Sequence, residues 1–300
     1  MSTADSSLPM VSYIMPVYNR ANVVGQAIAG VIEERRTNYP NIELVVMDGG
    51  STDGTVEIIQ SFGDEIQVFH SGKDAGAADA FNKGAHLATG EIIRYVAGDD
   101  KILVGHTRRM VEYLIEHPEI DLLGARANCI RMDSEGCSTT SVRHSQLRGG
   151  WMTPEEVLSW DRKGVFAYIE TWFFRRRIFQ KIGYLDTKYR ICPDVDFAFR
   201  AVKAACPFYV LADTIVDKIF YTDGSNLVAN HAKGYAELKD VVARHGTAWQ
   251  RLKFFYDFPA PLPSRIFWSF WLAIGRLLQQ RRPSFYQSLQ KFARSGSRNG

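Results

Sequence analysis

Two adjacent carboxylates, Asp99 and Asp100, follow an apolar segment with the composition of a β-strand. Neighbouring carboxylates repel each other, and a bound divalent cation is the simplest compensation. Carboxylate oxygens are hard ligands that suit Mg²⁺ or Mn²⁺. The pair therefore predicts a metal site at the end of a strand.

A second acidic loop, residues 48–54, follows another β-rich segment and reads Asp-Gly-Gly-Ser-Thr-Asp-Gly. Asp48 is well placed there to bind a ligand. The same residues also fit a tight turn in which Thr52 or Asp53 caps a helix that begins near Thr55. The loop alone allows both interpretations.

Residues 71–84 place glycines ahead of a predicted helix, where backbone N–H groups can face an anion. Asp74 lies among these glycines. Asp79, Asn82 and Lys83 fall one turn apart and share a face of the helix. An ordinary solvated helix face has the same pattern, so this segment also has two interpretations.

The elements that carry these loops alternate regularly from residue 11 to residue 100. β-rich patterns predict strands over 11–15, 42–47, 66–70 and 91–96, with helices between them. Such alternation predicts an α/β, Rossmann-like, mostly parallel sheet with helices on both faces. Ligands bind sheets of this kind beyond the carboxyl ends of the strands.

The pattern becomes less regular after residue 105. We expect strands at 122–131 and 169–174, a turn at 133–136, and a last amphipathic stretch at 265–282. Helices are expected at 105–116, 176–182 and 194–205. The organisation we predict is a regular first part at 9–105, a less regular second part at 106–243 and a basic, aromatic-rich helical extension at 244–300.

Composition indicates a globular chain, with 46% hydrophobic and 23% charged residues among 300. No window approaches the roughly 20 apolar residues that a membrane span needs, and the first residues lack the pattern of a signal peptide. A cytoplasmic location is the resulting expectation. Four cysteines without C-x-x-C or zinc-finger spacing predict reduced, packed thiols.

Residues 244–300 contain ten Lys or Arg residues against one acid, Asp257, together with many aromatics. Such a composition suits an anionic lipid surface or a nucleic acid. The stretch at 265–282 fits a helix lying in a membrane interface, at the inner face of the plasma membrane. It fits equally well a helix packed against protein.

The acidic loops, taken together and in order, resemble the inverting glycosyltransferases of family 2, which have the GT-A fold. The matching blocks run from Pro16-Val17-Tyr18-Asn19 through 48–55, 74–84 and 88–91 to Asp99-Asp100. Weaker matches follow at 174–176, 183–186 and 194–200. The resemblance implies a metal-dependent enzyme that moves a sugar from a nucleoside diphosphate to an acceptor hydroxyl, in cell-surface polysaccharide or glycolipid synthesis.

The resemblance implies that residues 9–105 bind the nucleotide sugar and that residues 106–243 bind the acceptor. It also implies roles for single residues. Asp48 would accept a hydrogen bond from the nucleotide base, most readily uracil or thymine, which makes a UDP- or dTDP-sugar the expected donor. Asp100 would hold Mn²⁺ or Mg²⁺, and Asp99 would lie on the ribose or sugar side of that metal site. The other expected donor contacts are Pro16, Tyr18, Asn19, Asp74, Asp79, Asn82 and Lys83.

Asp194 matches the carboxylate that serves this family as general base. It also fits the N-cap of the helix that follows, and Asp196 is a second candidate for the base. The family often has Glu-Asp where this chain has Pro193-Asp194. Many relatives carry a late histidine, and whether His231 is a metal ligand stays open.

The acceptor is expected to be a saccharide or a lipid-linked saccharide. Four aromatic residues of the second half could stack on sugar rings or belong to the core: Trp151, Trp160, Tyr168 and Trp172.

Other classes fit less well. A nicotinamide-dependent enzyme would have G-x-G-x-x-G after the first strand, and a sugar-nucleotide pyrophosphorylase would have a glycine-rich basic loop there; neither is present. The alternative from another class is a degenerate scaffold that binds membrane or nucleic acid through its tail. The joint presence of Asp48, Asp99, Asp100 and Asp194 favours an enzyme, and no nucleic acid is expected.

Overall fold

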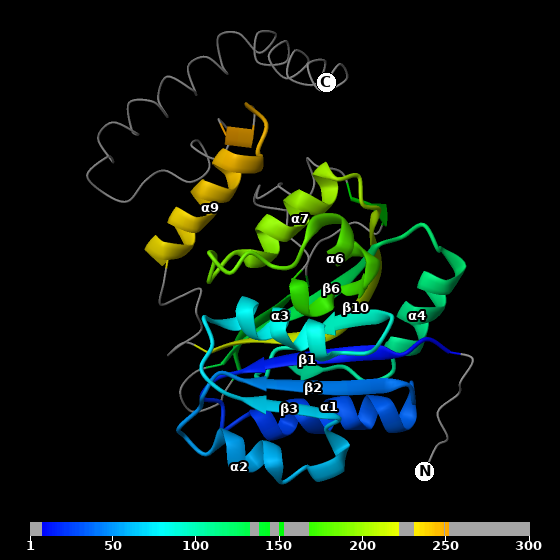
Figure 1. Cartoon of the computed structure of the whole chain (residues 1–300), viewed down its shortest axis with the longest axis vertical. Coiled ribbons are helices and arrows are strands. Elements are labelled where there is room, and N and C mark those ends of the chain that lie inside the picture. Colours follow the sequence, from blue (N-terminus) through cyan, green and yellow to red (C-terminus); the bar gives the residue numbers. More distant parts are fainter. Residues whose placement is uncertain are drawn as a thin grey trace. The chain divides into compact units, whose positions relative to one another are not determined.

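Figure 1 shows a computed structural model of the chain, which describes residues 8–132, 138–144, 150–152, 168–221, 231–248 and 250–251. The chain divides into two compact units, Met1–Val241 and Val242–Gly300. The predicted turn at 133–136 and amphipathic stretch at 265–282 lie outside the described residues. The roles predicted for 9–105, 106–243 and 244–300 stay predictions.

The described strands form one sheet. They are β1 (Val11–Val17), β2 (Ile42–Asp48), β3 (Val68–Ser71), β4 (Ile92–Tyr95), β5 (Lys101–Ile102), β6 (Leu122–Met132), β7 (Ser138–His144), β8 (Gly150–Trp151), β9 (Phe173–Arg175) and β10 (Phe208–Tyr221). The strand order is β3-β2-β1-β4-β9-β6-β10-β5, with β7 beside β6 and β8 beside β10.

The described helices are interleaved with these strands. They are α1 (Val24–Thr37), α2 (Thr55–Gln60), α3 (Ala77–Leu87), α4 (Thr107–Glu116), α6 (Arg177–Ile182), α7 (Pro193–Lys203) and α9 (His231–His245), together with the 3₁₀ turns η1 (Gly63–Glu65) and η2 (Ile169–Thr171).

The first half of the sheet is parallel, as the sequence predicts. β1 pairs in parallel with both β2 and β4, and β2 pairs in parallel with β3. Beyond β4 the direction changes, because β9 pairs antiparallel with β4 and with β6. β6 and β10 are again parallel to each other. The carboxyl ends of β1, β2 and β4 therefore meet at one edge.

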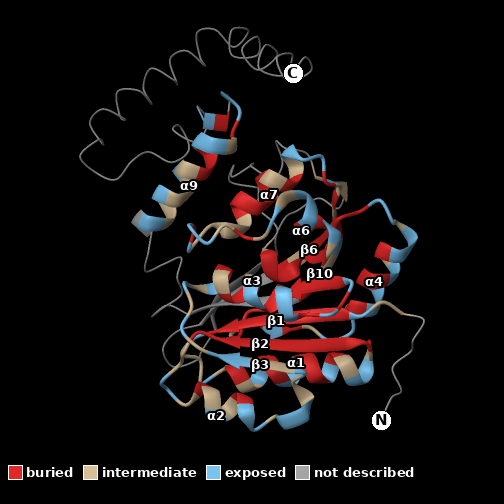
Figure 2. Ribbon diagram, in the orientation of Figure 1, coloured by how far each residue is buried: buried red, intermediate tan, exposed pale blue. Residues whose placement is uncertain are grey.

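Helices cover both faces of the sheet, and a separate apolar core lies on each (Figure 2). β1 is buried along its whole length, and its side chains alternate between the two faces. Ile14 packs with α3, α6 and α7, whereas Tyr13 and Met15 pack with α1 and α4.

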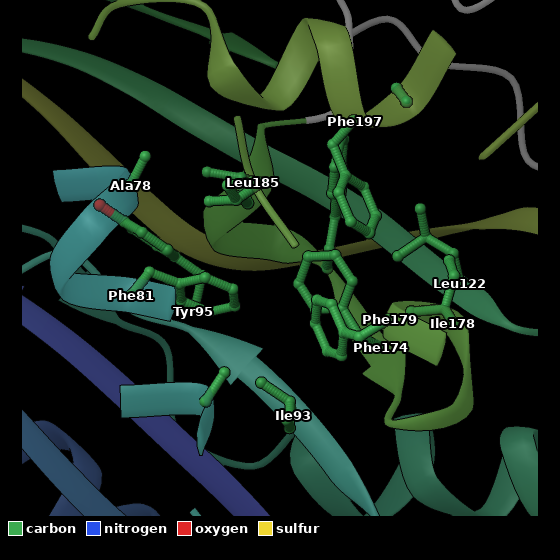
Figure 3. Close-up of a cluster of buried hydrophobic side chains, with 14 of the residues drawn as sticks. Ala78, Phe81, Ile93, Tyr95, Leu122, Phe174, Ile178, Phe179, Leu185 and Phe197 are labelled. Atoms are coloured by element: carbon green, nitrogen blue, oxygen red, sulfur yellow. The ribbon is translucent and has the colours of Figure 1, made fainter. Parts of the chain in front are cut away.

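The first of these cores is rich in aromatic rings (Figure 3). Phe174 of β9 lies 5.5 Å from Phe179 of α6 and 5.5 Å from Phe197 of α7, between ring centroids. Phe81 of α3 lies 6.0 Å from the same Phe174 ring. These contacts fix α7 against the sheet, and α7 carries Asp194 in its first turn.

Most predicted elements are present with shifted ends. Residues 169–174 were expected to form one strand, but 169–171 form a 3₁₀ turn and only the end of the segment joins the sheet as β9. The long strand β10 and helix α9 were not predicted.

Within the described residues, no helix is long and apolar enough to span a bilayer. The described part of the second unit continues α9 to His245. A short capped turn follows, in which the Thr247 amide donates to Gln250 Oε1 over 2.8 Å.

Candidate functional site

The predicted donor-site loops lie together at the carboxyl edge of the parallel strands. The pairing register places Asp48 beside Val17 on one side and beside Ser71 on the other. Backbone hydrogen bonds extend this alignment into the loops, since Gly49 donates to the Val17 carbonyl over 2.9 Å and Gly72 to the Asp48 carbonyl over 3.0 Å. Asp99 and Asp100 follow β4 at the same edge.

Asn19 and Arg20 connect the loop after β1 to the loop after β2. The Asn19 amide donates to Ser51 Oγ over 2.8 Å, and Asn19 Oδ1 accepts from the Thr52 amide over 3.0 Å. The Arg20 amide donates to Thr55 Oγ1 over 2.8 Å. The Asn19 side chain thus orders the second loop, and Tyr18 beside it is 59% exposed.

Asp48 is only 2% exposed, and several donors hold one of its oxygens. Oδ2 accepts from the Ser71 hydroxyl at 2.6 Å, from the Gly50 amide at 3.0 Å and from the Ser51 amide at 3.1 Å. Among the hydrogen bonds recorded for the described residues, Oδ1 has only a 3.3 Å contact with the Ser51 amide. Asp48 therefore orders its turn through Oδ2 and keeps acceptor capacity on Oδ1.

Gly49 and Asp74 approach each other so closely that a larger residue at position 49 would displace the Asp74 carboxylate. A Cβ on Gly49 would lie 2.7 Å from Asp74 Oδ2, well inside van der Waals contact. Asp74 Oδ1 accepts from the Gly76 amide over 2.8 Å, and Gly76 has a φ of 120°. The Asp74 carboxylate is thereby held against the turn that follows Asp48.

Asp79, Asn82 and Lys83 share a face of α3, as predicted, but each already has a protein partner. Asp79 forms an ion pair of 2.9 Å with Lys83, and the Lys83 hydrogen bond lowers the pKa of Asp79. Asn82 uses both ends of its carboxamide on the main chain of Leu185, donating over 2.8 Å and accepting over 3.1 Å. In this structure Asn82 therefore joins α3 to the segment before α7.

Asp99 and Asp100 differ in their surroundings. Asp99 accepts from Arg20 Nε at 3.0 Å, with 21% of its side chain exposed, whereas Asp100 is 3% exposed. No cluster of three or more His, Cys, Asp or Glu residues suited to a metal occurs in the described part of the chain. A cation at Asp99 and Asp100 would therefore need further ligand oxygens, which the phosphates of a nucleotide provide.

Asp194 lies in the first turn of α7, where Pro193 is the first helical residue. The N-cap position belongs to Cys192, so the interpretation of Asp194 as the N-cap was wrong. Asp194 Oδ1 accepts from the Val195 amide over 2.9 Å. Burial and the carboxylates of Asp194 and Glu237 raise the pKa of the Cys192 thiol, which therefore stays protonated.

Asp196, the second candidate for the base, is buried and already has a partner in this fold. It is 2% exposed and forms an ion pair of 2.7 Å with Arg200 one turn later. Arg200 also donates to the carbonyls of Ile182 and Tyr184, at 2.5 and 2.8 Å. A carboxylate committed to this network is poorly placed to collect a proton from a substrate.

The remaining predicted residues have mixed outcomes. Trp172 is fully buried among Phe174, Phe197 and Phe208, so it belongs to the core. Trp151 is 52% exposed and lies edge-on to Tyr209. Trp160 and the His231 side chain lie outside the described residues, and Tyr168 is partly exposed.

The downstream arginines that matched the family have structural partners. Arg176 donates to the carbonyls of Ala85, Ala88 and Gly90, at 3.1, 2.7 and 2.8 Å. These carbonyls end α3 and lead into β4, so Arg176 caps α3. The sequence analysis assigned no role to the side chain of Arg20, which holds Asp99, or to Glu237, which binds the loop before Asp194.

Comparison with known proteins places this fold and site in context. A PGL/p-HBAD biosynthesis glycosyltransferase of Mycobacterium tuberculosis is 29% identical over 230 residues, which cover 71% of this chain and 82% of that protein. An uncharacterized glycosyltransferase of Rickettsia felis is 26% identical over 74% of this chain and 36% of its own length.

Solved structures have the same GT-A fold. S. aureus TarS in complex with UDP-GlcNAc matches with a TM-score of 0.62 and 16% identity, over 90% of this chain and 81% of that one. These findings lend no support to a degenerate scaffold. The family model described as glycosyl transferase family 2 matches residues 12–183, more than half of the chain, and the protein therefore belongs to that family.

Proposed function

We propose that this glycosyltransferase moves a sugar from a nucleoside diphosphate sugar to an acceptor hydroxyl with inversion. The observation that carries the proposal is the meeting of Asp48, Asp99 and Asp100 at one sheet edge, with Asp48 Oδ1 keeping acceptor capacity. A base-binding carboxylate and a pair of metal-binding carboxylates at one edge match the two ends of a nucleoside diphosphate.

Asp48 Oδ1 accepts the ring N–H of the base in this proposal. Uracil and thymine present such an N–H between two carbonyl groups, so a UDP- or dTDP-sugar is the proposed donor. TarS was crystallised with UDP-GlcNAc, which supports uracil. A mannosyltransferase from Pyrobaculum calidifontis, with a TM-score of 0.58 and 18% identity over 98% of this chain and 87% of that one, was solved with GDP-Man and Mn²⁺.

Asp100, with Asp99 beside it, would hold Mn²⁺ or Mg²⁺, because adjacent carboxylates supply the hard oxygens that these ions prefer. When bound, such an ion neutralises charge on the departing diphosphate. Arg20 keeps Asp99 turned toward the loop after β1, where Asp99 meets the ribose or sugar side of the donor.

Asp194 takes the proton of the acceptor hydroxyl as that oxygen attacks the anomeric carbon. The bond from this carbon to the diphosphate oxygen breaks as the new bond forms, which inverts the configuration. Asp194 is suited to this step because it is partly exposed in the first turn of α7. The acceptor is a saccharide or lipid-linked saccharide bound by residues of 106–243, and the M. tuberculosis relative named for PGL/p-HBAD biosynthesis supports a glycolipid.

The decisive experiment is a panel of UDP-, dTDP- and GDP-sugars, each tested for Mn²⁺-dependent hydrolysis and for a Mn²⁺-dependent rise in melting temperature. We expect one uridine or thymidine donor to give both signals, and EDTA to remove both. A panel in which no donor stabilises the protein or is consumed would refute the proposed function.

Peripheral attachment of residues 244–300 to an anionic membrane is a separate part of the proposal, supported by the basic and aromatic composition. Sedimentation with vesicles that contain phosphatidylglycerol, and not with phosphatidylcholine alone, is the expected result. Deletion of residues 258–300 should abolish it, and binding that survives this deletion would rule out the tail as the anchor.

A further inference from the structure

One carboxylate binds three consecutive backbone amides immediately before Asp194. Glu237 of α9 accepts from the amides of Arg190, Ile191 and Cys192, at 3.0, 2.7 and 3.1 Å. The separation in sequence reaches 47 residues, so this contact joins two distant segments of the first unit.

The chemistry of these hydrogen bonds makes them strong. Bonds from neutral N–H groups to a carboxylate are roughly twice as strong as bonds between neutral groups. The amides lead into the N-terminus of α7, where the helix dipole also favours a negative charge. Cys192, the N-cap residue, supplies no capping side chain, and Glu237 binds its backbone amide from outside the helix.

Two further contacts hold α9 to the same segment. Asp240, one turn after Glu237, accepts from Lys188 Nζ at 2.8 Å and from Tyr189 Oη at 2.6 Å. Gly234, one turn before Glu237, lies so close that a Cβ there would be 3.3 Å from Ile191. One face of α9 therefore binds and packs against residues 188–192 along two helical turns.

The start of the same segment is also fixed. Asn82 of α3 binds the main chain of Leu185, and Arg200 binds the carbonyl groups of Ile182 and Tyr184. The start of this segment is therefore held by α3 and α7. The position of Asp194 then depends on how residues 188–192 are held, and α9 holds them.

We propose that Glu237 is a positioning residue that orients Asp194 for proton transfer through the three amides of residues 190–192. The inference rests on the proposed function in taking Asp194 as the base. It assigns to α9, which the sequence did not single out, a part in the chemical step.

The test is Glu237→Gln. The substitution preserves size, but the carboxamide directs an NH₂ group at one or more of the amides and loses the charge. We expect kcat for transfer to fall about ten-fold or more, because small misplacements of a catalytic group are costly. The dissociation constant of the UDP–Mn²⁺ complex should stay within about two-fold, since the donor loops are untouched. Lys233→Ala, an exposed change on the same helix, is the control.

A double-mutant cycle separates positioning from general damage. In an Asp194→Asn background, Glu237→Gln should cause no further loss of kcat, because the group it orients is gone. Additive losses, or a Glu237→Gln enzyme with normal kcat, would overturn the inference. So would an Asp194→Asn enzyme with normal kcat, although the transferase itself would then stand.

Hydrogen exchange provides a readout that does not depend on turnover. The amides of residues 190–192 should exchange faster in Glu237→Gln than in the Lys233→Ala control, with protection of β1 and β2 unchanged. Equal exchange at 190–192 would show that Glu237 does not order this segment and would overturn the inference even if no sugar donor were found.

Discussion

Asp48 and Ser71, the last residues of the neighbouring strands β2 and β3, share a hydrogen bond of 2.6 Å. The bond occupies Asp48 Oδ2, which also receives the Gly50 and Ser51 amides. The strand register that places Ser71 beside Asp48 thus decides which of the two oxygens is occupied by protein donors and which keeps acceptor capacity.

The first prediction concerns this carboxylate. Asp48→Asn should raise the dissociation constant of UDP about ten-fold or more, because the one remaining oxygen cannot serve both the Gly50 and Ser51 amides and the base, and a hydrogen bond to a charged group contributes roughly 1.5–3 kcal/mol. kcat at saturating donor should change much less, because the base contact is alike in the ground and transition states. Calorimetry and steady-state kinetics measure the two effects. Asp64→Asn, an exposed acid on η1, is the matched control.

The second prediction concerns the metal. Asp100→Asn should abolish the rise in melting temperature that UDP gives only with Mn²⁺, and with it transfer, because the cation contributes both to affinity and to leaving-group charge. Thermal denaturation with UDP alone, Mn²⁺ alone and both together measures the coupling. If the Asp100→Asn enzyme kept its Mn²⁺-dependent turnover, Asp100 would not be a ligand of the metal.

The parts predicted best from the sequence are those coded locally. The first four strands and the loops after them follow from apolar runs that end in Asp, Gly and Asn, and parallel pairing then brings Asp48 and Asp100 to one edge. β10 was not predicted, because Asp213, Asp217 and Lys218 interrupt its apolar residues and break the pattern of a buried strand.

Contacts between distant residues could not be predicted in this way. Arg20 and Asp99 are 79 residues apart, and Asn82 and Leu185 are 103 apart. The sequence identified the shared face of Asp79, Asn82 and Lys83, but tertiary packing decided that Asn82 binds main chain. The contacts of Glu237 could not be predicted for the same reason, because nothing in the sequence pattern of α9 indicates that Glu237 binds a loop 45 residues away.

The third prediction separates the base from its surroundings. Asp194→Asn keeps the shape of the side chain and an oxygen that can accept from the Val195 amide, but it removes the basic group. kcat for transfer should fall about 10² to 10⁴-fold, with the melting temperature and donor affinity little changed. Radiolabelled sugar transfer and thermal denaturation provide the measurements. Near-normal transfer by this variant would contradict the assignment.

The last prediction tests Asp196 as a structural partner of Arg200. Asp196→Ala leaves Arg200, whose side chain is 21% exposed, without its carboxylate partner, and breaking such a pair costs about 3 kcal/mol of unfolding free energy. Urea denaturation should show this loss, whereas Lys203→Ala, an exposed change on α7, should stay within about 0.5 kcal/mol of the parent. kcat per folded molecule should fall no more than a few-fold, because Asp196 takes no proton. If instead the variant kept its stability and lost transfer a hundred-fold, Asp196 would replace Asp194 as the base, and the Arg200 network would have to be read as part of the active site.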